Sequence, residues 1–205
     1  MGKQVFPTKG NLINTKKTLN LARVGFDLLD RKRNILVREM MTLIDSAKTI
    51  QEQIDDCYSQ AYLALQRANV AHGVVEDIAA SVPVEDGLTL SSRSVMGVEL
   101  PIVNLEPRPL ELSYGFVFTS ALVDEAYLKF NRVKTLSAEL AEVENSVYRL
   151  ATAINKTQKR ANALKNIVIP RLTSTVKNIS ESLEEKERED FSRLKVIKSK
   201  KQTTP

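Results

Sequence analysis

The sequence has no tryptophan, one cysteine, one histidine, and only seven glycines and seven prolines among 205 residues. A single cysteine excludes a disulfide framework and a zinc site built from several thiolates, and it is typical of a reducing compartment. Aromatic residues make up 5% of the chain, which argues against a large globular core built on big side chains. No apolar run approaches the roughly 18 residues of a membrane span, and the first residues lack the apolar segment of a secretory signal. We therefore expect a cytoplasmic protein without direct membrane insertion.

Sequence patterns of enzymes are missing as well. The chain contains neither a GxxxxGK[ST] phosphate loop nor a GxGxxG motif. Its one histidine, His72, cannot complete a Ser-His-Asp or Cys-His arrangement of the usual kind. Cys57 lies within an apolar pattern, where packing as a small apolar residue explains it better than reactivity. We expect no catalytic residue, no metal site and no cofactor.

The positions of proline and glycine divide the chain into three parts. There is no proline between Pro7 and Pro83 or between Pro109 and Pro170, whereas six of these helix breakers fall within 83–109. This distribution predicts a long N-terminal helix over 1–81, an irregular region with a β-hairpin over 82–115, a long C-terminal helix over 116–198 and a disordered tail over 199–205.

The first long segment carries a heptad repeat. Eighteen of its twenty seam positions are apolar, and the two exceptions are Arg33 and Thr15. The seam positions are Leu12, Thr15, Leu19, Ala22, Phe26, Leu29, Arg33, Leu36, Met40, Leu43, Ala47, Ile50, Ile54, Cys57, Ala61, Ala64, Ala68, Ala71, Val75 and Ile78. A strict period of seven over ten heptads predicts a helix that supercoils around a partner helix.

The second long segment repeats this pattern with a shift of register. Its seam runs from Val123 to Val133, resumes at Leu136, and continues to Val168. Pro170 removes a backbone donor, so we expect a kink there, followed by a renewed apolar stripe from Leu172. Two such helices around a compact middle predict an all-α fold, a long antiparallel two-helix coiled coil with a short β-hairpin at its tip. Ile54 would then lie near Leu150 and Leu12 near Leu194. A parallel homodimer is the competing arrangement.

Charge is distributed unevenly. Residues 1–33 hold eight basic and two acidic side chains, and residues 186–205 hold seven basic and three acidic ones. Residues 76–112 hold two basic and seven acidic side chains. Antiparallel folding would bring the two basic ends together and place the acidic region at the opposite end. Either these charges are ordinary solvated surface, or the two ends bind different partners. Nucleic acid is a possible partner of the basic end, although no aromatic stacking platform accompanies it.

Small seam residues mark a second candidate surface. Ala61, Ala64, Ala68 and Ala71 allow a close approach of two helices, and the apolar stripe is wider beside them. This is either extra packing or a docking face for a small partner, for which we take the candidate residues Tyr58, Leu65, Val74, Val95, Met96 and Val98.

Several stretches together resemble one family. PTKGNLINTKKTLNLARVGFDLLDRKRNIL at the N-terminus, MGVELP from Met96, TQKRANALKNIVIPRL from Thr157 and LEEKEREDFSRLK from Leu183 are similar to the D subunit of the V-type and archaeal A-type ATPases. The matches occur in order over nearly the whole chain.

The resemblance implies a non-catalytic rotor shaft in the central stalk of a rotary ATPase, peripheral to the membrane in the soluble sector. It implies as partners the hexamer of A and B subunits, the small F subunit of the central stalk, and the funnel-shaped subunit that links to the membrane ring, with no nucleic acid. The alternative function is a free-standing coiled-coil adaptor or scaffold that could bind nucleic acid at its basic end.

Basic residues near the chain ends are the predicted contacts with the hexamer: Lys16, Lys17, Arg23, Arg31, Lys32, Arg33, Lys159, Arg160, Arg171, Arg193 and Lys195. Arg33 stands out because it places a charge on the apolar seam. It is either a register device with a carboxylate partner or a residue that points into the hexamer.

Overall fold

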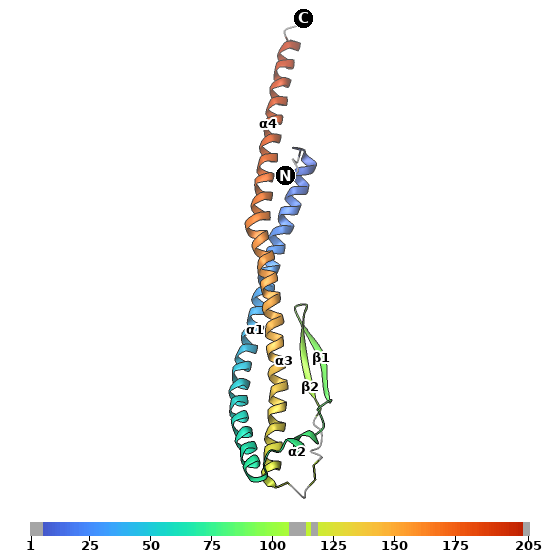
Figure 1. The fold of residues 1–205 in the computed structure, drawn as a ribbon. Helices are drawn as coiled ribbons and strands as arrows, with labels where there is room; N and C mark the ends of the chain where they lie inside the picture. Colours follow the sequence, from blue (N-terminus) through green and yellow to red (C-terminus); the bar gives the residue numbers. More distant parts are fainter. Residues whose placement is uncertain (1–5, 107–113, 116–118, 203–205) are drawn as a thin grey trace. The chain divides into compact units, whose positions relative to one another are not determined.

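The computed structural model describes residues 6–106, 114–115 and 119–202. Its elements are α1 (Lys9–His72), α2 (Glu76–Ala80), β1 (Leu88–Val95), β2 (Val98–Leu105), α3 (Ala121–Ala163), a π-helical turn (Leu164–Val168) and α4 (Ile169–Gln202) (Figure 1). The chain divides into a terminal unit of residues 1–33 and 155–205 and a central unit of residues 34–154. The all-α class with a two-stranded antiparallel sheet is confirmed.

Helix ends differ from the expected boundaries for local reasons. α1 ends at His72 because Gly73 adopts a left-handed conformation with φ 79°, which terminates helices well. α3 begins at Ala121, where Ser120 acts as the N-cap and its hydroxyl accepts from the Leu122 N–H at 3.4 Å. At the other end, α4 continues to Gln202, so residues 199–202 are helical where a disordered tail was expected. Residues 203–205 lie outside the described residues.

The heptad seam predicts the packing of α1 correctly. Every buried residue of α1 occupies a seam position: Leu19, Leu36, Ile54, Ala61, Ala64 and Ala68. The returning helices run antiparallel to α1 in each unit. In the terminal unit Lys9 pairs with Glu187 and Arg33 with Gln158, and in the central unit Ala68 packs with Val123.

The expected pairing of individual residues along the seam is wrong. Leu150 packs against Leu36 rather than Ile54, and Leu194 is 63% exposed rather than covered by Leu12. Because α1 stops at His72 instead of residue 81, the chain turns back earlier. Residues of the returning helices therefore meet α1 positions closer to the N-terminus.

The β-hairpin closes with a two-residue turn. Val95 pairs with Val98 across Met96 and Gly97, whose φ angles are 51° and 75°. Positive φ at both central positions is the type I′ pattern, which matches the twist of the flanking strands. Pro101 lies inside β2, which continues to Leu105. Cross-strand pairs alternate between hydrogen-bonded and non-hydrogen-bonded, counted from the hydrogen-bonded pair Val95↔Val98 beside the turn. Ser92↔Pro101 is therefore a non-hydrogen-bonded pair, where the N–H that proline lacks would not have bonded to the other strand.

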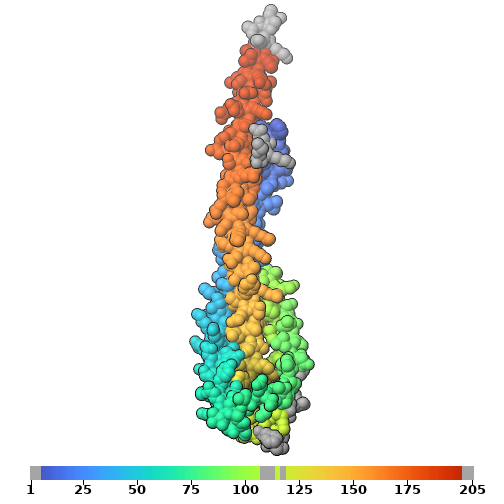
Figure 2. Space-filling model, viewed as in Figure 1, coloured from blue at the N-terminus to red at the C-terminus, as the bar shows by residue number. Residues whose placement is uncertain are grey.

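The hairpin lies along the helices of the central unit and not beyond their tip. Leu100 is fully buried in a cluster with Leu36 of α1 and Leu150 of α3. Arg93 forms an ion pair with Glu39 at 2.8 Å, and Glu142 accepts from the Val103 N–H at 2.7 Å. The space-filling view shows the green hairpin surface directly against the yellow surface of α3 (Figure 2).

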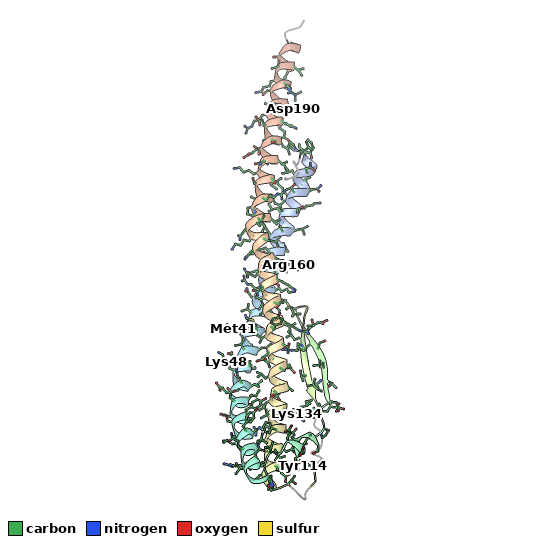
Figure 3. The ribbon with its side chains drawn as sticks, viewed as in Figure 1. Met41, Lys48, Tyr114, Lys134, Arg160 and Asp190 are labelled. Atoms are coloured by element: carbon green, nitrogen blue, oxygen red, sulfur yellow. The ribbon has the colours of Figure 1, made fainter. Side chains whose placement is uncertain are left out.

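A second small core closes the turn of the central unit. Tyr114 and Val123 pack on Ala68, and Val75 and Ile78 cover them from the side. The label in Figure 3 places Tyr114 beside the first turns of α3. This core joins Tyr114 and the start of α3 to the end of α1.

Candidate interaction surfaces

The candidate sites lie on the surface of the described residues. No three His, Cys, Asp or Glu side chains among them lie close enough together to hold a metal ion. None of the helices, as far as their residues are described, combines the length and apolar character needed to cross a membrane. Each unit presents exposed charged and apolar patches of its own, and these patches are the candidate sites.

The predicted basic residues all belong to the terminal unit. Nine of the eleven are exposed, and Lys32 and Arg33 are half-buried. Two of them have weak local partners on α4: Arg193 lies 3.5 Å from Glu189, and the Lys195 ammonium lies 5.0 Å from the centre of the Phe191 ring. Side chains this exposed gain little stability from such pairs, so their charges remain accessible to a partner.

Arg33 has the carboxylate partner that a structural role requires. Its guanidinium lies 2.7 Å from the Asp30 carboxylate, one turn earlier on α1. It also donates to the Gln158 side-chain oxygen on α3 at 2.8 Å. The charge on the seam is thus bridged to the facing helix, and this bridge is satisfied only in the observed register.

The terminal unit also exposes an apolar stripe that the sequence reasoning missed. Leu21, Val24 and Leu28 of α1 are 71%, 47% and 60% exposed, and we call these three residues the back stripe. Each lies two positions after a seam residue, about 200° around the helix, so the back stripe faces away from the seam. Lys17 and Arg31 continue the same row at its two ends. The sequence signal that could have revealed the back stripe is this second row of residues, which are alternately four and three positions apart.

The last part of α4 carries further exposed apolar side chains. Phe191, Leu194 and Ile197 are 59%, 63% and 54% exposed. α1 begins at Lys9, which pairs with Glu187, so α4 continues past the end of its partner helix in this unit. The expected apolar stripe of α4 therefore exists, but its last residues are not covered by the described residues of α1.

The central unit contains an aromatic row near the start of α3. The rings of Tyr58 and Tyr62 stack with centroids 5.9 Å apart, and Tyr62 meets Phe130 of α3 edge-on at 5.6 Å. Tyr62 and Phe130 were missed by the sequence reasoning, which included Tyr58. Tyr62 is 53% exposed, and Val70 further along α1 is 89% exposed. Large aromatic side chains of this kind are typical anchors of protein interfaces.

The six predicted docking residues do not form one surface. Tyr58, Leu65 and Val74 follow one another along the last third of α1 and the turn after it, and Val74 is 82% exposed. Val95 and Val98 instead pack against the cluster of Leu36. Leu36 precedes Tyr58 by 22 positions on one helix, which corresponds to about 33 Å. The six residues thus fall into two separate groups of three.

Met96 belongs to the second of these groups. It is 44% exposed and occupies the hairpin turn with φ 51°. Its side chain is therefore accessible, unlike the half-buried valines on either side of it.

Among the described titratable groups, Tyr114 has the pKa that its surroundings shift most strongly. Burial, followed by hydrogen bonding to the Asp124 carboxylate, raises the pKa of Tyr114 to about 12. Its hydroxyl donates to Asp124 at 2.6 Å, and its ring meets Tyr127 edge-on. Nearby, the ion pair with Lys129 lowers the pKa of Glu125. The contacts of Tyr114 with Asp124 and Tyr127 hold this tyrosine to the start of α3, whereas the Glu125–Lys129 pair lies within α3.

Antiparallel helices with exposed basic and apolar patches are typical of a subunit that packs against partners in a larger assembly. The sequence model of the ATP synthase D-subunit family matches residues 11–199. The V-type ATP synthase D subunit of Thermotoga neapolitana is 45% identical over 198 residues, covering 96% of this chain and 98% of that protein. The A-type ATP synthase D subunit of Thermococcus kodakarensis is 40% identical over 200 residues, covering 95% and 94%, and that of Pyrococcus furiosus is 39% identical over 201 residues, covering 96% and 94%.

The chain therefore belongs to the ATP synthase D-subunit family, which confirms the resemblance noted in its sequence. It is a component of a V/A-type ATP synthase, and membership of such a complex implies partner subunits.

Proposed function

We propose that this chain is the non-catalytic central rotor shaft of a V/A-type rotary ATPase. It couples ATP hydrolysis or synthesis in the hexamer of A and B subunits to the translocation of H+ or Na+ through the membrane ring. The observation that carries the proposal is the surface of the terminal unit. There the back stripe, nine of the eleven basic residues and the uncovered end of α4 are exposed on one pair of helices.

These patches support hexamer contact because they combine apolar area with positive charge. Leu21, Val24 and Leu28 form an apolar row with a basic residue at each end. Burial of exposed leucine and valine supplies binding free energy of about 1.5–3 kcal/mol per fully buried side chain. The flanking charges steer the approach and fix the orientation.

An asymmetric surface suits the task of a rotor. Only one side of α1 in the terminal unit bears the back stripe. Three otherwise equivalent catalytic sites would therefore each meet a different face of the shaft. A difference of a few kcal/mol between those faces is enough to favour one site at each step.

The central unit would contact the partners that rotate with the shaft. The aromatic row of Tyr58, Tyr62 and Phe130 offers anchors for the small F subunit, and exposed Val74 extends the apolar surface beside it. We assign to the hairpin turn at Met96 either a contact with the rotating partners or a modulating role in hydrolysis. The end with Val74 would rest on the funnel-shaped subunit that caps the ring.

A reconstitution experiment tests the proposal. The full chain, the F subunit and the A and B subunits are assembled, and ATP-driven rotation is observed with a bead attached to the rotor. The variant Leu21→Glu/Leu28→Glu should bind the hexamer at least about tenfold more weakly, because two buried anchors become charged. It should still melt at the wild-type temperature, because both residues are exposed.

Met41→Glu is the matched control. Met41 is exposed on α1 of the central unit, at 57%, and lies outside the proposed hexamer contact. This variant should bind and rotate like the wild type. Normal hexamer affinity of the double variant would remove the back stripe from the interface, and assembly without any rotation of the wild type would contradict the rotor function.

A further inference from the structure

Within the terminal unit, α3 passes into α4 through a turn that is not α-helical. Residues Leu164–Val168 form a π-helix, and the Ile169 N–H donates to the Leu164 carbonyl five residues earlier. Each π-helical turn holds one residue more than an α-helical turn, and such turns are less stable than the α-helix around them.

The extra residue explains how the apolar seam continues. From buried Thr157, steps of seven lead to half-buried Leu164 and then to positions 171 and 178. These two positions hold exposed Arg171 and Asn178. The seam instead uses Leu172 and Ile179, of which Ile179 is 3% exposed. The seam thus moves by one residue between Leu164 and Leu172, and the π-helical turn absorbs that residue.

Hydrogen bonding is weakened at the same place. Pro170 follows directly and has no N–H, so the backbone ladder lacks one donor there. In a regular α-helix its ring would also press on the carbonyl of Asn166, and the wider turn relieves this clash. Lys165, Asn166, Ile167 and Pro170 are at least partly exposed, so water can compete for the backbone groups.

The facing part of α1 does little to lock this turn. A Cβ atom built on Gly25 would lie 3.9 Å from the Leu164 side chain, so the glycine leaves a methyl-sized space beside it. The Lys165 ammonium lies 5.8 Å from the centre of the Phe26 ring, a loose contact for an exposed cation. By contrast, the Arg33–Gln158 hydrogen bond fixes the helices before the turn, and buried Ile179 fixes them after it.

We propose that the π-helical turn Leu164–Val168 is a torsional joint, at which α4 twists relative to α3 before either α-helix deforms. Conversion of the π-turn to an α-turn would rotate α4 by about 100° around its own axis. It would then bring Arg171 and Asn178 to the seam in place of Leu172 and Ile179. The resting chain resists this exchange, because it buries polar groups and exposes apolar ones. The joint therefore twists when torque is applied to α4 and returns when the torque is removed. The source of that torque rests on the proposed rotor function.

Deletion of one residue tests the joint in the full chain without any partner. A variant lacking Asn166 removes the extra residue, so a continuous α-helix carries Leu172 and Ile179 into the regular seam. Its melting temperature should be at least that of the wild type. Hydrogen exchange of backbone amides near the turn should be faster than in the flanking helix in the wild type. In the variant it should slow by about tenfold, to the level of the neighbours.

A variant lacking Ser174 is the matched control. Ser174 is also exposed but lies in α-helical α4, so its deletion moves Ile179 off the seam and should lower the melting temperature. Equal destabilisation by the two deletions would overturn the proposal. Slow exchange at the turn of the wild type would overturn it as well.

The assembled complex tests the use of the joint. With a bead on the rotor, the variant lacking Asn166 should show narrower angular fluctuations in each catalytic pause than the wild type. Equal fluctuations would overturn the torsional role. An assembled wild type that does not rotate would instead contradict the proposed function, while the exchange result on the free chain would stand by itself.

Discussion

Substitution of Leu100 by alanine tests whether the hairpin is part of the core of the central unit. Leu100 has no exposed surface and packs with Leu36 and Leu150, each of which is also fully buried. Leucine-to-alanine changes at such sites cost about 2.7–5 kcal/mol in well-studied cores, in proportion to the cavity that remains. A two-stranded hairpin can move inward and fill part of the space. We therefore expect a loss of about 3 kcal/mol, near the lower end of that range.

The assay is urea unfolding followed by far-ultraviolet circular dichroism, since the chain has no tryptophan to report. A loss of about 3 kcal/mol corresponds to a melting temperature lower by about 6–12 °C for a chain of this size. Leu90→Ala is the control, because Leu90 lies on the same hairpin but is 71% exposed. That variant should stay within about 0.5 kcal/mol of the wild type.

The result that refutes this reasoning is a Leu100→Ala variant as stable as Leu90→Ala. The hairpin would then be an appendage that leaves the helices unaffected. The same logic applies to removal of residues 88–105, which would leave Leu36 and Leu150 facing water. We expect the helices to remain folded in that deletion variant, with a loss similar to that of Leu100→Ala.

Two further predictions concern polar groups at the helix contacts. Arg33→Leu should raise the melting temperature, because a polar residue at a seam position specifies register at a cost in stability, and the Asp30 side chain, 36% exposed, remains hydrated when Arg33 is replaced. Coupled hydrolysis should fall, because the hydrogen bond to Gln158 that fixes the register is lost. No change in either melting or coupled hydrolysis would contradict both roles considered for Arg33. Tyr114→Phe should make stability less dependent on pH at high pH. The pKa of Tyr114 is raised from 10.0 to about 12 in the folded state, so the folded state holds the proton more strongly than the unfolded state. The stabilisation from Tyr114 is therefore complete below about pH 10 and is lost between about pH 10 and 12. Urea unfolding at about pH 9 and about pH 11.5 measures this loss, and identical wild-type and variant profiles would contradict it.

Helix pairing could be predicted because a heptad repeats the same local information many times. Each seam residue supports the same face, so exceptions such as Arg33 do not obscure it. The β-hairpin was also predictable, because alternating apolar residues mark its strands, although its turn at Met96 and Gly97 was not placed in advance. Both features are therefore accessible from the sequence.

The docking of the hairpin was not accessible in this way. The alternation in β1 and β2 marks strands but does not say which helix surface receives Leu100. That choice depends on Leu36 and Leu150, which are distant in the sequence. The end of α1 at Gly73 was missed because the seam pattern continues past it to Val75 and Ile78, which pack beyond the helix end.

The candidate surfaces were only partly visible in the sequence. Basic residues are conspicuous in the printed chain, whereas the back stripe consists of ordinary leucines and a valine between other apolar residues. Its exposure becomes evident only when the partner helix is known to lie on the other side. The π-helical turn did leave a signal, the step of eight residues from Leu164 to Leu172, which a kink at Pro170 alone would not require.

The three-residue cluster of the central unit also constrains how the chain folds during synthesis. Its members Leu36, Leu100 and Leu150 are separated by 64 and 50 residues, so two long loops must close before the cluster exists. The hairpin can form early from its local pairs, but its anchor residue waits for α3. At translation rates of about 5–20 residues per second, the seam of α1 remains uncovered for several seconds. During that interval a nascent α1 can pair with the seam of another copy, so timely synthesis of α3 protects the chain from misassembly.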